Sequence, residues 1–210
     1  MVQVAVAVVR AGSPFEAASR ILVERRRYGE VVERMATRYK ALKVGPADAD
    51  LDVGPLISER QRSIVTRFIA EGADLKTAAT GEIIEGAPSG GHYVAPTLFA
   101  DVAPDHRLAQ EEIFGPVQVV IPFDDEAEAV AVANGTGYGL VAGLWTSDGG
   151  RQMRLAKALR AGQVFLNNYG AGGGVELPFG GVGKSGHGRE KGFEALYGFS
   201  ALKTVAAWHG

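Results

Sequence analysis

Cysteine is absent from the 210 residues, and this absence excludes three kinds of chemistry. These residues can form no disulfide, hold no zinc on thiolates and offer no cysteine nucleophile. An excess of basic charge is also lacking, because 22 Lys and Arg residues against 24 Asp and Glu leave a net charge of −2, whereas binders of nucleic-acid backbones are basic. No apolar run reaches the ~20 residues that a membrane span requires. We therefore expect neither nucleic acid nor a membrane as a partner.

The first residues are apolar but lack the features of a secretion signal. Residues 2–9 follow no basic start, and no small-x-small cleavage site precedes Arg10. The alternation of valine with small residues is instead typical of a buried strand. These features favour a cytoplasmic protein.

The first half of the chain predicts two helices separated by a loop. Residues 28–42 place four apolar side chains on one helical stripe. Ser58 and Gln61 predict a capping box at the start of a second helix. Between these helices, two Gly-Pro pairs make residues 43–55 a loop. Residues 76–102, interrupted by glycines, predict the short strands of a hairpin region.

From residue 116 onward, strands and helices alternate. Single-helix connections between apolar strands imply parallel pairing with crossovers. The predicted fold class is therefore α/β, with helices covering a largely buried parallel sheet. The predicted elements are strands at 116–123, 140–146 and 164–168, helices at 126–133 (capped by Asp125) and 151–159, a last helix near 190–197, and a terminal strand at 202–208.

Glycine is abundant, with 29 residues, about twice the usual ~7%. Residues 181–186 satisfy the dinucleotide pattern G-x-G-x-x-G, but no strand precedes them and no acidic residue follows about twenty positions on. A phosphate loop ending in Lys184-Ser185 would require glycine where Pro178 stands. A glycine-rich connecting loop packed against the sheet is therefore the better interpretation.

Other polar groups leave more than one interpretation open. The four histidines share no ligand spacing, so we expect no metal site. Glu111, Glu112 and Phe114 lie in a loop at a strand end, a common ligand position in α/β proteins. Their spacing alone favours a capping carboxylate and a core phenylalanine. Residues 167–169 (Asn-Asn-Tyr) are equally consistent with a site and with a turn.

Several longer segments resemble the catalytic-domain half of the NAD(P)-dependent aldehyde dehydrogenase superfamily. The resemblance runs from about residue 11 to the end and covers less than half of a full family member. It implies an aldehyde-dehydrogenase-like catalytic domain over residues 1–200, with a dissimilar strand at 1–10, and an oligomerisation strand at 201–210. The matching segments are VGPADADLDVGPLI at 44–57, EEIFGPV at 111–117, NGTGYGL at 134–140, GQVFLNN at 162–168, LPFGGVGKSGHGRE at 177–190 and LKTV at 202–205.

The resemblance also shows what is missing. The family's nucleophile is a cysteine thiolate in a segment like A-G-Q-x-C-x-A-x-x-R, and aligning Ala17 and Arg20 puts Phe15 at the cysteine position. A benzyl group cannot form the covalent intermediate. The family's general-base glutamate, its oxyanion-hole asparagine and the nucleotide-binding domain belong to a portion not present here. No catalytic residue is therefore predicted.

The residues that remain have supporting roles in the family. By resemblance, Glu112 matches the glutamate that binds the nicotinamide ribose hydroxyls, and Phe114 the aromatic residue beside the nicotinamide. Phe179 corresponds to an aromatic residue of the aldehyde pocket. The cofactor implied is NAD or NADP, which we do not expect this chain alone to bind, and the implied substrate is a small aldehyde.

Three functional hypotheses follow. The chain is an aldehyde oxidoreductase that is active only when another chain supplies the missing half, or a non-catalytic binding module, or an interaction subunit that pairs with intact dehydrogenase subunits. A truncated or frameshifted gene would explain the altered motif around Phe15. The apolar terminal strand predicts a homo-oligomer, most simply a dimer.

Overall fold

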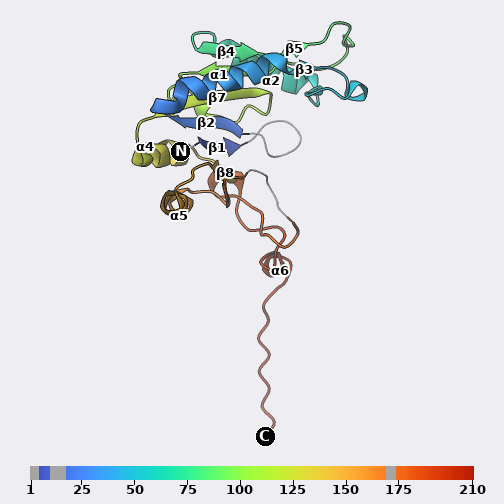
Figure 1. The fold of residues 1–210 in the computed structure, drawn as a ribbon. Helices are drawn as coiled ribbons and strands as arrows, with labels where there is room; N and C mark the ends of the chain where they lie inside the picture. The colour runs from blue at the N-terminus through green and yellow to red at the C-terminus, as the bar shows by residue number, and fades with distance from the viewer. Residues whose placement is uncertain (1–4, 10–17, 169–173) are drawn as a thin grey trace.

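The structure is a computed structural model that describes residues 5–9, 18–168 and 174–210. Its centre is a seven-stranded sheet, visible in Figure 1 as strands stacked from β4 to β8. In spatial order the strands are β4 (Lys76–Thr80), β6 (Thr97–Ala100), β7 (Val117–Phe123), β2 (Ala18–Glu24), β1 (Ala5–Val9), β8 (Val141–Leu144) and β9 (Gln163–Leu166). A small second sheet pairs β3 (Lys43–Val44) with β5 (Glu82–Ile83).

Six α-helices and two 3-10 helices accompany the sheets in the described part of the chain. They are α1 (Arg25–Ala41), α2 (Glu59–Glu71), α3 (Arg107–Gln110), α4 (Glu126–Asn134), α5 (Gly149–Ala158), α6 (Ala195–Gly198), η1 (Ala47–Ala49) and η2 (Gly183–Ser185). No helix among the described residues is long and apolar enough to cross a bilayer.

The predicted parallel direction of β7, β8 and β9 is confirmed. β8 pairs with β9 in parallel, β7 pairs with β2 in parallel, and β1 is antiparallel to both β2 and β8. The three predicted strands therefore point the same way. However, β7 and β8 are not neighbours, because β2 and β1 lie between them. The sequence analysis missed β2, the strand at the centre of the sheet.

The core has two layers because successive strand residues face opposite sides of the sheet. Leu22, Phe99 and Val119 pack into the larger cluster, which also contains buried residues of α2, α4 and α5. Their sequence neighbours Val23, Leu98 and Val120 face the other side, where the apolar stripe of α1 covers them. The predicted stripe of residues 28–42 is thus confirmed as the inner face of α1, which begins three residues earlier and ends at Ala41.

Side-chain caps fix where the other long helices begin. The Ser58 hydroxyl accepts from the Gln61 backbone N–H at 3.2 Å, and Asp125 accepts from the Glu128 N–H at 2.8 Å, as predicted. Asp148 caps α5 in the same way by accepting from the Arg151 N–H. The capping box at Ser58 is only half formed, because the Gln61 side chain bonds to the loop before β7 instead.

Two predictions near the chain's later loops need correction. The predicted helix near 190–197 is reduced to the four residues of α6, because Lys191 and Gly192 adopt left-handed φ angles of 59° and 61° that a helix cannot contain. The predicted loop 43–55 includes the short strand β3. Residues 201–210 carry no secondary structure in the single chain and extend away from the body (Figure 1), so their role as an oligomerisation strand stays a prediction.

Candidate functional site

A polar pocket forms where three of the sequence segments singled out above meet. It encloses about 280 Å³ of open space between the start of β2, the segment that follows α3, and the loop after α4. Most of its lining residues carry polar side chains. They are Ser19, Arg20, Ala109, Gln110, Glu111, Glu112, Thr136 and Tyr138.

Arg20 is the buried charge of this pocket, with 4% of its surface exposed. Its guanidinium donates to the carbonyl oxygens of Val132 (2.8 Å) and Ala133 (3.4 Å) in the last turn of α4. A cation at a helix C-terminus is favourable because the last carbonyls carry the negative end of the helix dipole. Burial lowers the pKa of Arg20 to about 10, and its Nε has no hydrogen-bond partner. Arg20 therefore ties the central strand β2 to α4.

The segment around Glu112 is held by its neighbours in sequence. Ile113 is buried in the core, while Phe114 has a left-handed φ of 54° and is 41% exposed. The Gln61 side-chain amide donates to the carbonyl oxygens of both residues at 3.1 Å. Gly115 follows because a Cβ there would lie 2.4 Å from the Val65 side chain. The interpretation of Phe114 as a core residue is therefore wrong, and Ile113 has that position.

The glycine-rich loop packs against the loop after α4. The backbone N–H groups of Val182 and Lys184 donate to the carbonyls of Gly139 (3.0 Å) and Gly137 (2.8 Å). The Ser185 hydroxyl accepts from the Gly139 N–H, and the Lys184 ammonium lies over the Tyr138 ring. The interpretation of residues 181–186 as a packed connecting loop is thus confirmed.

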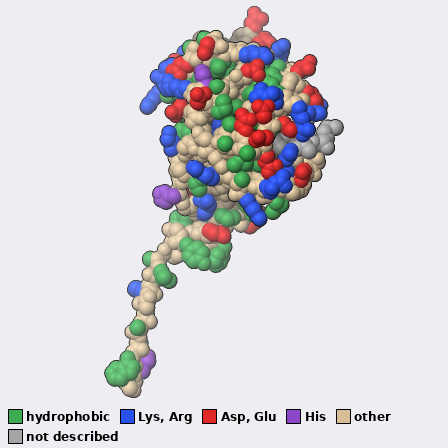
Figure 2. Space-filling model, turned by 90° about the vertical axis from the view of Figure 1, so that its left-hand side faces the viewer, with side chains coloured by type: hydrophobic (Ala, Val, Ile, Leu, Met, Phe, Trp, Pro, Cys, Tyr) green, Lys and Arg blue, Asp and Glu red, His purple; other side chains and the backbone are tan. Residues whose placement is uncertain are grey.

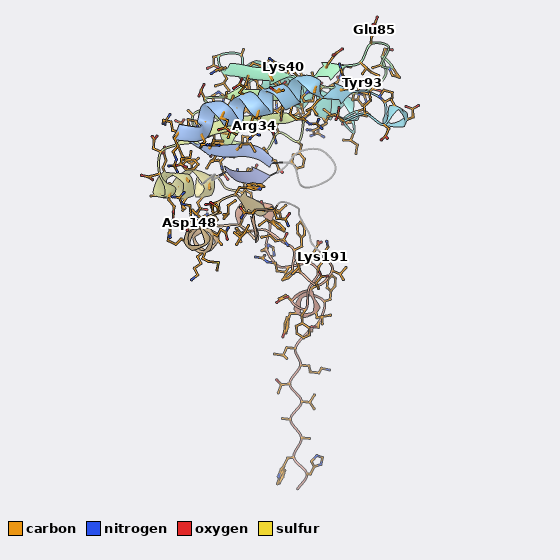
Figure 3. All side chains as sticks on the ribbon, in the orientation of Figure 1. Arg34, Lys40, Glu85, Tyr93, Asp148 and Lys191 are labelled. Carbon is orange, nitrogen blue, oxygen red and sulfur yellow. The ribbon has the colours of Figure 1, made fainter. Side chains whose placement is uncertain are left out.

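Phe179 lies farther along this loop, outside the lining of the polar pocket. It is half-buried and exchanges two backbone hydrogen bonds of 2.6 Å with Glu190. The ammonium of Lys191, labelled in Figure 3 in the part of the chain that leads to the C-terminal segment, lies 5.5 Å from the centre of the Phe179 ring.

The structure thus brings together only part of the predicted site. Glu112 lines the pocket, Phe114 and Phe179 do not, and Phe15 lies outside the described residues. Among the described residues, no three acidic, histidine or cysteine side chains form a group that could hold a metal ion. Asn167 is a turn residue, because its side-chain amide bonds to both backbone groups of Thr146.

Sequence reasoning missed the part that Arg20, Thr136 and Tyr138 play in this pocket. A signal for Arg20 was available, because an arginine beside the apolar run Ile21–Leu22–Val23 must be buried and is seldom buried without partners. The other two residues reach the pocket through a loop, which no periodicity predicts.

Solved structures with the same fold are aldehyde dehydrogenases. A crystal structure described as an aldehyde dehydrogenase from Burkholderia cenocepacia superposes with a TM-score of 0.89 at 63% identity, covering 92% of this chain and 41% of that one. The NAD+ complex of an aldehyde dehydrogenase from Bacillus cereus superposes with a TM-score of 0.83 at 38% identity, covering 90% and 38%. The fold and the shared sequence define an α/β dehydrogenase catalytic domain.

Sequence comparison leads to the same group of proteins. A betaine aldehyde dehydrogenase of Sinorhizobium fredii is 43% identical over 192 residues, covering 89% of this chain and 39% of the relative. The model of the aldehyde dehydrogenase family matches residues 2–205. The chain therefore belongs to the aldehyde dehydrogenase family, and it spans about two fifths of the length of the relatives it matches.

A dinucleotide cofactor finds only part of a site in the described residues. Glu112 and Phe114 offer a carboxylate and an accessible ring at one edge of the pocket. The glycine-rich loop does not fit a pyrophosphate, because the N–H groups of Val182, Lys184, Ser185 and Gly186 all donate to carbonyl oxygens of the protein. A phosphate cradle needs such groups free to point at the ligand.

Proposed function

We propose that this chain supplies the catalytic-domain scaffold of an aldehyde dehydrogenase and does not oxidise aldehydes by itself. The observation that carries the proposal is the absence of cysteine from the 210 residues. Family resemblance assigns the nucleophile to a cysteine thiolate, which attacks the aldehyde before hydride passes to the nicotinamide. Phenylalanine at position 15 has no lone pair or ionisable hydrogen with which to replace it.

The residues that support the family reaction are present. By resemblance, Glu112 would bind the ribose hydroxyls of NAD or NADP, and Phe114 would pack beside the nicotinamide, which accepts the hydride when the cofactor is bound. Phe179 would contact the aldehyde. The half-buried position of Glu112 in the pocket wall and the exposure of the Phe114 ring support the first two roles. A second chain would have to hold the pyrophosphate.

The test is NAD(P)H formation by the full chain with a panel of aldehydes, betaine aldehyde included, at high protein concentration. We expect no turnover above the buffer rate. The matched variant Phe15→Cys restores only the thiol, so it is expected to react with a thiol reagent and still to form no NADH. Aldehyde-dependent NADH from the unmodified chain would show that another group acts as the nucleophile and would refute the proposal.

A second candidate function is association with another copy of the chain. Its observation is the C-terminal segment, residues 199–210, which projects from the body in Figure 2 with apolar side chains along it. Leu202, Val205 and Trp208 are each at least 81% exposed. Apolar side chains on an extended backbone with free hydrogen-bonding groups favour pairing with a strand edge. By family resemblance, the partner is a second subunit in a homodimer.

Light scattering at micromolar concentration tests this association. We expect twice the 22.1-kDa mass of the chain, and we expect the variant that lacks residues 199–210 to give a monomer. A monomeric full chain would refute the association. A dimer that survives the deletion would place the interface elsewhere.

A further inference from the structure

The central strand β1 is the only hydrogen-bonded link between two parts of the described sheet. On one side lie β4, β6, β7 and β2, and on the other side β8 and β9. β1 is antiparallel to both of its neighbours, which point the same way and do not pair with each other. The position of β1 is therefore a slot whose two walls are strand edges.

The walls of this slot are deeply buried. Leu22 and Val23 on β2 and Ala142 and Leu144 on β8 are each at most 2% exposed. A slot without a strand would leave the backbone N–H and C=O groups on both walls without partners inside the core, which is costly. Some extended segment must therefore occupy the slot in any folded form of the protein.

The pairing of β1 is short and irregular for a central strand. It opposes β8 at three positions, Val6 to Val8, and its pairing with the seven-residue β2 shifts register between Val8 and Val9. Along the described chain, β1 connects to the rest of the sheet only through residues 10–17. The strand can therefore leave the slot while the remaining elements keep their own connections.

The sequence of this segment identifies what can replace it. Residues 2–9 contain no charge, no proline and no glycine, and five of the eight are valine. Such a segment pairs readily with other strands when it is exposed. A second copy of the chain offers the same segment, which makes the same hydrogen bonds in the slot. Reciprocal exchange between two copies also closes on itself, so no edge is left open.

We propose that two copies of this chain exchange β1, so that each copy's Ala5–Val9 occupies the slot between β2 and β8 of the other. This exchange does not depend on residues 199–210, because the slot and the C-terminal segment share no residue. It therefore succeeds or fails independently of the association proposed above.

The absence of native cysteine allows a direct test by disulfide trapping in the full chain. Ala7 opposes Ile21 in the register of β1 and β2, and Val8 opposes Ala142 in the register of β1 and β8. Directly opposed residues in antiparallel strands lie within the range that a disulfide spans. The double variants A7C/I21C and V8C/A142C are unfolded, refolded at micromolar concentration, oxidised and compared on non-reducing gels.

Exchange predicts that most of the oxidised protein runs at twice the chain mass, and that removal of residues 199–210 does not change this result. A mixture of the single variants A7C and I21C should give the mixed disulfide dimer. T66C, on the exposed face of α2, replaces I21C as the control and should give only the background of random links. Only monomers with an internal link, a ladder of higher multimers, or no link in either pair would each overturn the proposal.

Discussion

Gly162 is the position where a single methyl group should detach the glycine-rich loop. A Cβ built on Gly162 would lie 1.6 Å from the carbonyl oxygen of Gly180 and 2.7 Å from its carbonyl carbon. Ordinary van der Waals contact begins at 3.4 Å, so in Gly162→Ala the Gly180 carbonyl must move by almost 2 Å. Both groups belong to the backbone, and no side-chain rotation relieves the overlap.

The cost follows from the bonds that such a shift breaks. The Gly139 carbonyl accepts from both Gly162 and Val182 at 3.0 Å, and the Gln163 side chain donates to the Pro178 carbonyl at 3.0 Å. Each bond contributes about 1 kcal/mol net, so Gly162→Ala should lower the free energy of unfolding by about 2–3 kcal/mol. With a urea slope of about 2–3 kcal/mol per molar, the midpoint falls by about 1 M.

Gly29→Ala is the matched control. Gly29 lies inside α1 with no atom within 4 Å of its virtual Cβ, so alanine should raise the free energy of unfolding by about 0.5–1 kcal/mol through helix propensity. The measurements are urea unfolding and amide exchange at Val182 and Lys184, which should quicken only in Gly162→Ala. An unchanged midpoint and unchanged exchange in that variant would show that the loop is not docked as described.

Three further predictions concern single side chains. Arg20→Met should lower the free energy of unfolding by about 1–3 kcal/mol in urea titrations, because the charge-assisted bonds to Val132 and Ala133 outweigh the relief of desolvation; equal stability would contradict this balance. Burial raises the pKa of Tyr28 to about 12, so the folded state holds this proton more tightly than the unfolded state, and stability present below pH 10 is lost as the pH rises toward 12. Tyr28→Phe should reduce that loss without abolishing it, because the pKa of Tyr39 is also raised by burial, and a pH series of thermal melts measures the difference. Ser58→Ala should cost about 1 kcal/mol in the same melts, whereas Ser58→Asp retains the cap of α2 and should cost little.

The helices and the apolar strands could be predicted because local signals specify them. The cap at Ser58, the cap at Asp125 and the stripe of α1 each depend on residues within a few positions of one another. The order of the sheet could not be predicted in the same way. β2 contains Arg20, whose partners Val132 and Ala133 are more than 110 residues away, and no local pattern shows that a charge will be satisfied at such a distance.

The candidate site shows the same division. Family resemblance placed Glu112, and the structure puts this residue in the wall of a pocket. Spacing favoured a buried Phe114, but the left-handed turn at that residue presents its ring to the surface and leaves Ile113 in the core. The direction of a side chain in a loop depends on φ angles, and in this loop they follow from the contact of Gly115 with Val65 and from the bonds to Gln61.

The C-terminal segment also divides the protein's two tryptophans between two environments. Trp145 directly follows β8 and is partly buried, whereas Trp208 is 93% exposed near the end of the segment. An indole in water emits at longer wavelengths than one shielded by protein, so the two contributions can be separated. Docking of the segment on a partner would shift the Trp208 emission to the blue, while unfolding of the sheet would shift the Trp145 emission to the red. Intrinsic fluorescence therefore distinguishes assembly from folding in this chain without any label.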